Sequence, residues 1–151
     1  MTVHLEDMVD GIESDLAALT ISDTIHTSVS GFTILGRGLG KDPAEHENLG
    51  LWLDVPSTSN EGHYSDSPED DAYGMDDLVV TLRYRLGTSE DRRPAYAQAM
   101  AHERTIRETV VRSTDARGWR ARWSGARRTR STNGAWYDIA QRFGVSRDVS
   151  L

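Results

Sequence analysis

Residues 78–86 read LVVTLRYRL, and this stretch decides the fold class of the chain. Its side chains alternate between an apolar and a polar side, the period of two that is typical of a β-strand. The apolar side consists of Val80, Leu82, Tyr84 and Leu86. Arg83 and Arg85 fall on the opposite side. A strand with one buried and one solvated face indicates an antiparallel or edge-exposed sheet.

A helix is predicted directly after this strand, beginning near Pro94, because proline suits the first helical turn. Apolar side chains then recur every third or fourth position, as on the buried face of a helix. This stripe consists of Ala95, Ala99, His102, Ile106 and Val110. Its small alanines let the helix lie close to the sheet, and we expect His102 to be half-buried against that sheet.

The N-terminal part of the chain predicts a second helix and two further strands. Residues 5–19 carry apolar side chains at i, i+3, i+4, i+7, i+11 and i+14, which indicates a helix. Gly11 lies inside it and costs about 1 kcal/mol relative to alanine. A strand is suggested from Phe32 onward. Residues 49–55 alternate as a half-buried strand, which we expect Pro56 to end.

The C-terminal part predicts two strands joined by a tight turn. Trp119 and Trp123 alternate with arginines, so we expect both tryptophans to enter the core. Residues 127–132 continue extended, and Asn133-Gly134 is a strong hairpin signal. The apolar face of the return strand consists of Tyr137, Ile139, Phe143 and Val145.

These elements predict an α+β fold: one mainly antiparallel sheet of about four to five strands with two helices packed on one face. Residues 1–151 are expected to form one domain. Residues 57–77 contain almost no apolar side chain and many acidic ones, which predicts a long acidic loop. The acids at its centre are Asp66, Glu69, Asp70 and Asp71. They lack the alternation of a calcium loop, so a diffuse acidic surface is the better interpretation.

Charge divides the chain into two parts. Residues 1–80 hold 17 acidic and two basic residues, whereas residues 81–151 hold 15 arginines and seven acidic residues. The whole chain has a net charge of −7. A molecule with one acidic and one basic part is suited to binding copies of itself head to tail.

Several classes of function find little support in the residues. There is no cysteine, no apolar run long enough to span a bilayer, and no basic segment of a signal peptide. We therefore expect an intracellular protein, or part of a particle assembled inside a cell. The glycine-rich residues 36–42 lack the spacing of a phosphate-binding loop, and the histidines lack metal-ligand spacing. We expect no enzyme, no cofactor and no metal.

The stretch from Arg117 to Arg130 interleaves arginines with tryptophans, a composition typical of faces that bind single-stranded nucleic acid. The negative net charge and the lack of a nucleic-acid motif argue against that function. A contact between subunits is the stronger hypothesis. Its arginines would be Arg83, Arg85, Arg120, Arg122, Arg127, Arg128 and Arg130. They would face Asp66, Glu69, Asp70 and Asp71 of a neighbouring copy.

The order of elements resembles a known family. The N-terminal amphipathic helix, the strand LVVTLRYRL, the helix PAYAQAMAHERTIRETVV and the closing GAWYDIAQRFGV resemble the tail terminator proteins of long-tailed bacteriophages and related archaeal tailed viruses. The resemblance covers most of residues 3–147. The long acidic loop and the strong charge split depart from the pattern of that family.

The resemblance implies a structural protein of the virion without catalytic residues. A hexameric ring of subunits would cap the tail tube, stop its growth and join it to the neck of the capsid. The partners would be further copies of this chain, the tail tube protein and a neck or connector protein, and DNA would pass through the lumen without specific binding. The ring would sit at the tail–neck junction after assembly in the host cytoplasm, with no membrane partner.

Two alternatives stay open. A head-completion or head–tail joining protein of the neck would belong to the same particle, although such adaptors are often more helical. A small nucleic-acid-binding protein that uses residues 117–130 would belong to another class, and its binding would weaken steeply with salt.

Overall fold

The computed structural model describes residues 2–26, 31–37, 48–63, 72–87, 90, 92–113 and 117–149. The helices are α1 (Leu5–Ala17) and α2 (Arg92–Arg112). The strands are β1 (Thr33–Arg37), β2 (Gly50–His63), β3 (Ala72–Arg85), β4 (Trp119–Arg130) and β5 (Trp136–Asp148). They form one sheet in the order β1-β2-β3-β5-β4, in which only the β1–β2 pair is parallel.

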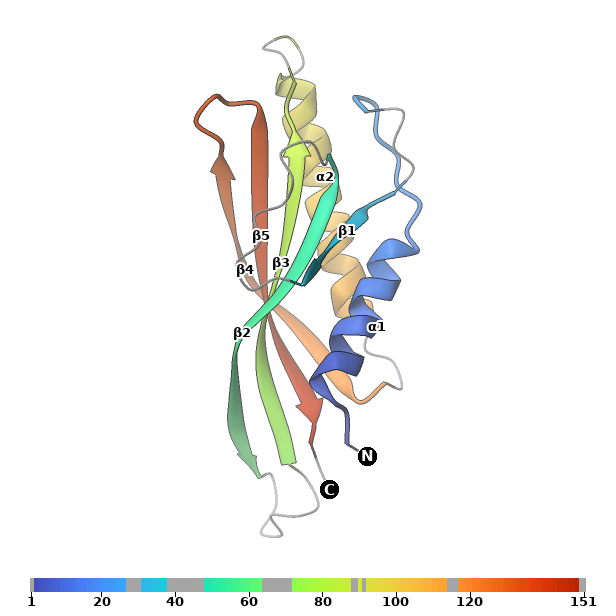
Figure 1. The fold of residues 1–151 in the computed structure, drawn as a ribbon, viewed down its shortest axis with the longest axis vertical. Coiled ribbons are helices and arrows are strands. Elements are labelled where there is room, and N and C mark those ends of the chain that lie inside the picture. The colour runs from blue at the N-terminus through green and yellow to red at the C-terminus, as the bar shows by residue number, and fades with distance from the viewer. Residues whose placement is uncertain are drawn as a thin grey trace.

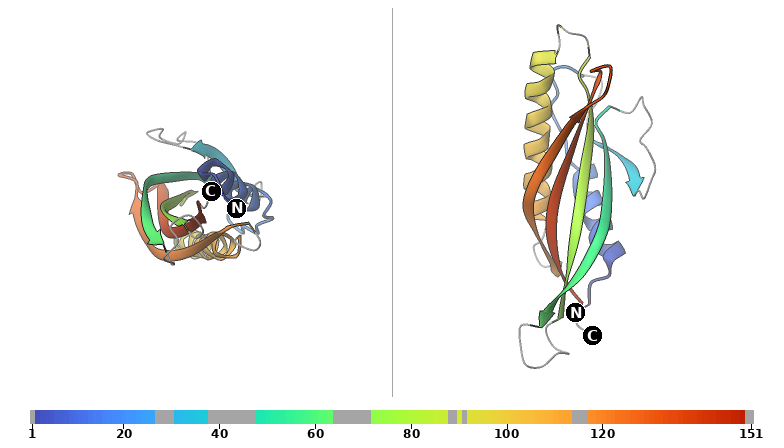
Figure 2. Two further views of the ribbon diagram at one scale, coloured as in Figure 1. Left: turned by 90° about the horizontal axis from the view of Figure 1, so that it is seen from below. Right: turned by 90° about the vertical axis from the view of Figure 1, so that its left-hand side faces the viewer.

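Both helices cover the same face of the sheet (Figures 1 and 2). The predicted α+β fold, with a mainly antiparallel sheet and two helices on one face, is confirmed. Neither described helix covers the opposite face of the sheet, and the right-hand view of Figure 2 looks onto it. We call it the open face.

The core lies between the sheet and the two helices, and the predicted periodicities place it correctly. The buried side chains of α1 are Met8, Val9, Ile12 and Leu16. The predicted stripe of α2 is buried in full, together with Glu103. Strand β3 contributes Leu78, Val80, Leu82 and Tyr84, and β5 contributes Tyr137, Ile139, Phe143 and Val145. Burial of these aliphatic and aromatic side chains supplies the main driving force for folding.

Pro56 does not end β2, contrary to expectation, because it lies at an irregularity where a proline is tolerated. The pairing with β1 reaches only Leu53, so no described strand pairs with β2 on that side beyond this point. The register with β3 shifts between Asp54 and Ser57. Proline lacks the amide hydrogen of a sheet ladder and is therefore confined to edges and bulges such as this one.

The predicted loop over residues 57–77 is also wrong at both ends. Residues 57–63 continue β2, and residues 72–77 already belong to β3, so most of this acidic segment forms a long hairpin arm. The β3 side of this arm is paired with β5 from Tyr73 onward, so the arm is part of the sheet. Strand periodicity was hidden here because the arm has polar residues on both faces.

Asp76 belongs to this segment but is a core residue. Its carboxylate is fully buried and accepts bonds from Arg147 Nε and Nη2 at 2.9 and 3.4 Å and from Thr58 Oγ1 at 2.6 Å. Arg147 Nη1 also donates to the carbonyl oxygen of Val3 at 2.8 Å. This buried pair therefore joins β3, β5 and the chain before α1, which explains why the two termini lie side by side (Figures 1 and 2).

The hairpin between β4 and β5 is confirmed, with Gly134 at a φ of 73° and its amide donating to the carbonyl of Ser131 at 2.9 Å. The two tryptophans of β4 behave differently. Trp119 is buried, as predicted, but Trp123 is 39% exposed. Strand β4 lies at the edge of the sheet, and the Trp123 ring is therefore only partly covered by the core. Its indole N–H donates to Gln141 Oε1 at 3.1 Å.

Candidate interaction surface

The open face of the sheet carries a concentration of arginine. Strand pairing assigns six arginines to it, and four aspartates accompany them. The arginines are Arg83, Arg85, Arg120, Arg122, Arg127 and Arg142, and the aspartates are Asp54, Asp77, Asp138 and Asp148. The face comes from the alternation of β3, in which every residue between two core residues points away from the helices.

A β-bulge in β4 brings Arg127 to the same face as Arg120 and Arg122. The register with β5 shifts between Trp123 and Gly125, where Gly125 has a φ of 153°. One extra residue reverses the alternation, so an odd-numbered arginine joins two even-numbered ones. Strict alternation would have placed Arg127 toward the helices.

Arg83 is held on the open face by several contacts. Its Nε and Nη2 each donate to one carboxylate oxygen of Asp138 at 2.9 Å, the two-pronged geometry that fixes a guanidinium in place. The guanidinium carbon also lies 5.9 Å from the ring centre of Trp52 and 6.0 Å from that of Trp136. Arg83 and Trp136 line a cavity of about 430 Å³ together with Ser131, Thr132 and Asn133.

The remaining arginines of the face differ in whether a carboxylate neutralises them. Arg142 Nη1 donates to Asp77 Oδ2 at 2.6 Å. The side chains of Arg85, Arg120, Arg122 and Arg127 are exposed, and none of the four makes an ion pair within the described part of the chain. The open face therefore has an excess of positive charge that its own residues leave uncompensated.

Two arginines predicted for a subunit contact lie on the other side of the sheet. Arg128 donates from Nε and Nη2 to Glu103 of α2 at 3.2 and 2.6 Å, and this bond raises its pKa further. Arg130 stacks over the ring of Tyr96, with its guanidinium carbon 5.0 Å from the ring centre. The predicted acidic partners, Asp66, Glu69, Asp70 and Asp71, lie outside the described residues.

The Arg/Trp stretch 117–130 divides its arginines between the two faces of the sheet. Arg120 and Arg122 point to the open face, which carries neither tryptophan of this stretch. Trp119 is buried, and Trp123 lies on the helix side with Arg107 stacked 5.0 Å from its ring centre. Arg128 and Arg130 share the helix side with Trp123, but they are already engaged by Glu103 and Tyr96.

The sequence reasoning missed a second charged surface, on α1. This helix carries Glu6, Asp7, Asp10, Glu13 and Asp15 and no basic residue. Glu6, Asp7 and Asp10 are exposed. Asp15 is paired with Arg117 in a two-pronged contact at 2.7 and 3.1 Å. The apolar stripe predicts the buried side of this helix. The same 3.6-residue period groups its acids on the outer side.

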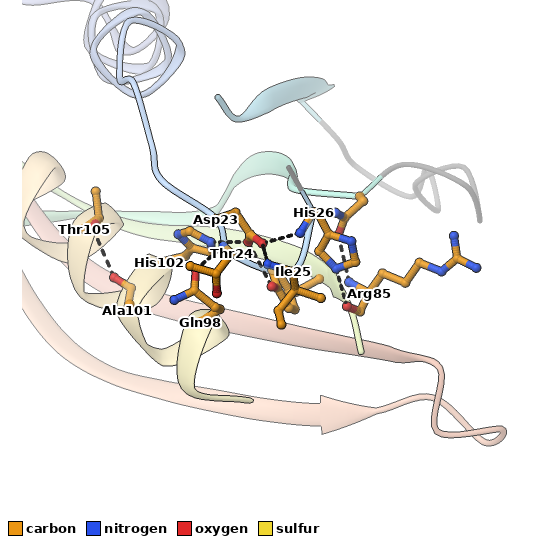
Figure 3. Close-up of polar contacts among 11 residues, drawn as sticks. Asp23, Thr24, Ile25, His26, Arg85, Gln98, Ala101, His102 and Thr105 are labelled. Atoms are coloured by element: carbon orange, nitrogen blue, oxygen red, sulfur yellow. Dashed lines mark hydrogen bonds and ion pairs between the residues drawn. The ribbon is translucent and has the colours of Figure 1, made fainter. Parts of the chain in front are cut away.

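A buried polar network around Asp23 also escaped prediction (Figure 3). His102 Nε2 lies 2.7 Å from Asp23 Oδ2, and the Tyr84 hydroxyl donates to the same oxygen at 2.9 Å. The backbone amides of Ile25 and His26 donate to Asp23 Oδ1 at 2.8 and 2.6 Å. His102 is thus fully buried, where a half-buried position was expected, and it faces a carboxylate.

The network holds the segment after α1 against α2 and β3. Burial raises the pKa of Asp23, but the hydrogen bonds from His102, His26, Tyr84 and Ile25 outweigh that effect and hold the pKa below its usual 3.8. Burial and the neighbouring Asp23 carboxylate raise the pKa of the Tyr84 hydroxyl well above its usual value. Each polar group of the network forms a hydrogen bond with another of its groups, so the network stabilises the segment after α1.

Two features are absent from the described residues. No group of three or more histidine, aspartate or glutamate side chains in the described ranges is placed to hold a metal ion. Neither described helix is both long and apolar enough to cross a membrane.

Comparisons with known proteins show a likeness in structure. No family model matches the sequence, and no curated protein matches it. Among solved structures, the fold is similar to a chain of a structure described as the virion of a native gene transfer agent particle. The two chains are 13% identical, each is covered over 91% of its length, and the TM-score is 0.47. A likeness at this level carries no argument about function.

Proposed function

We propose that this protein is a structural component of a tailed virus-like particle, with the role of a tail terminator ring subunit. The observation that carries the proposal is the open face, on which Arg85, Arg120, Arg122 and Arg127 have no ion pair within the described residues. A sheet face with excess positive charge is suited to a repeated contact with an acidic partner.

The residue types on the open face support an interface. Trp52 and Trp136 are half-buried around Arg83 and present rigid aromatic rings near the β4–β5 hairpin end of the face. Tryptophan and arginine are the side chains that most often dominate the energy of protein contacts. The exposed arginines toward the β4 edge would then steer the partner and set its angle.

The terminator role rests on the order of elements. The chain runs helix, three strands, helix and two strands, as expected from the resemblance to tail terminator proteins. In that role a hexameric ring would cap the tail tube, stop its growth and contact the neck. DNA would pass through the lumen without being read, and the protein would need no catalytic group or cofactor.

The proposal is tested by measuring the mass of the purified protein in solution as a function of salt, with light scattering after size-exclusion chromatography. We expect rings or larger oligomers at low ionic strength that dissociate as salt is raised, because exposed charges are screened over about 8–10 Å at physiological salt. Replacing Arg120, Arg122 and Arg127 together with alanine should leave monomers under the same conditions.

A matched control removes the same charge elsewhere. Arg93, Arg104 and Arg112 are exposed on α2, and their replacement with alanine should leave the oligomer intact. A wild-type protein that stays monomeric at every salt concentration, with and without tail tube protein, would overturn the proposal. Salt-sensitive binding to single-stranded DNA that is lost in the sheet variant would favour the nucleic-acid alternative instead.

A further inference from the structure

Among the described residues, the arginines of the open face and the acids at the start of α1 lie in opposite layers of the molecule. The arginines of the open face point away from the helices, and the exposed acids of α1 point away from the sheet, because its opposite side is buried in the core. The right-hand view of Figure 2 shows the strands in front and both helices behind them. The sheet and the core separate the two surfaces, so neither can neutralise the other within one molecule.

The acids at the start of α1 form the described surface that best complements the open face. Glu6 and Asp7 lie in the first turn, and Asp10 follows one turn later on the same outer side. Glu6 and Asp7 are exposed and make no ion pair within the part of the chain that is described. Helix geometry holds these carboxylates at fixed spacing, as a rigid counterpart to the arginines of β3 and β4.

We propose that α1 of a second copy of this chain docks onto the open face, with Glu6 and Asp7 opposite Arg120, Arg122 and Arg127. This inference rests on the proposed function and deepens it by naming the surface that each subunit offers to the next. In this proposal α1 provides the acidic partner of the arginines, a role for which the sequence suggested the acids of residues 57–77. Carboxylate–guanidinium pairs are directional, so such a contact would define the angle between neighbours.

The contact joins two different patches, so it is a head-to-tail contact. A two-fold dimer would bring the same patch of both copies together, which here would set arginine against arginine. Head-to-tail contacts generate closed rings when the rotation per subunit divides a full turn, and open filaments when it does not. The opposed layers of charge therefore favour a ring or filament over a two-fold dimer.

The test uses two charge-reversed proteins. One carries Glu6→Arg and Asp7→Arg, and the other carries Arg120→Glu and Arg122→Glu. Each alone should associate at least about tenfold more weakly than wild type, because like charges would then meet at every contact. When the two are mixed in equal amounts, every contact again joins opposite charges, so we expect an alternating assembly of wild-type size by analytical ultracentrifugation.

Controls separate this inference from the proposed function. Circular dichroism should show wild-type folding of both variants, and Glu6→Gln with Asp7→Asn provides a milder pair should the reversed helix fold poorly. Arg104→Glu with Arg112→Glu should not affect assembly. If wild type assembles and the α1 variants assemble equally well, or if the mixture fails to assemble, α1 is not the partner although the oligomer exists. If wild type never assembles, the proposed function itself fails.

Discussion

Packing against Trp119, rather than helix propensity, explains why residue 11 is a glycine. A Cβ atom at this position would lie 2.8 Å from Cη2 of Trp119, closer than side chains tolerate. Gly11→Ala gains about 1 kcal/mol of helix propensity, but overpacking against a buried indole costs about 1–3 kcal/mol. We expect the free energy of unfolding to fall by roughly 1 kcal/mol in total.

Urea unfolding measures this effect, and a second glycine provides its control. At Gly144 the added Cβ would meet Met75 Sδ at an ordinary 3.6 Å, so Gly144→Ala should cost less than Gly11→Ala. A stabilised Gly11→Ala protein would show that the helix and β4 can move apart freely.

Asp23 should make the free energy of unfolding depend on pH in the acidic range. Its pKa is held below 3.8 in the folded protein, so its carboxylate favours folding above the unfolded pKa. That contribution is lost as the pH falls through the folded value. At neutral pH, Asp23→Asn should cost about 1–3 kcal/mol, because His102 and Tyr84 lose a charged acceptor.

Unfolding curves of wild type and Asp23→Asn between pH 2 and 7 test this expectation. The difference between their unfolding free energies should shrink below about pH 4. A difference that stays constant over the whole range would mean that the Asp23 carboxylate is not what His102 and Tyr84 stabilise.

At the scale of elements, the Arg147–Asp76 pair connects β3, β5 and the chain before α1. Asp76 is fully buried and Arg147 is 11% exposed. Arg147→Met would leave the carboxylate buried with only the Thr58 hydroxyl as a described side-chain donor. Removing one partner of a buried pair is strongly destabilising, and we expect a loss of about 3 kcal/mol.

The neighbouring pair on the open face is the control for this change. Arg142 and Asp77 lie on the same two strands, but their side chains are 59% and 32% exposed. Arg142→Met should therefore cost at most about 1 kcal/mol. Thermal unfolding of both variants compares the two costs, and equal losses would contradict the assigned difference in burial.

Element boundaries show where local sequence signals reach their limit. The periodic apolar residues of α1, α2, β3 and β5 predicted these elements and their buried faces, because burial imposes the period directly. The arm of β2 and β3 has no such pattern, and a proline and many acids suggested a loop. Its strands exist because each pairs with a neighbour over many residues, a long-range contact that no local window contains.

At the scale of the whole molecule, the acidic and the basic part of the chain place α1 and the arginines of the open face in opposite layers, while α2 adds further arginines to the helix layer. Residues 1–80 contribute the acidic helix α1, and residues 81–151 contribute β4, β5 and the arginine-bearing end of β3. Both parts build one sheet and one core. The two charged surfaces consequently point in opposite directions, which is the arrangement used in the proposed head-to-tail contact.

The amino-acid sequence by itself determined the fold class, the buried faces of four elements and the hairpin at Asn133-Gly134, because each depends on local periodicity or turn chemistry. Only the tertiary structure decided which arginines share a surface. A single bulge in β4 reverses the alternation, so Arg127 joins the open face while Arg128 turns to Glu103. It also paired Asp76 with Arg147 and Asp23 with His102 across long stretches of chain, since partners in space are chosen by the packing of the whole core.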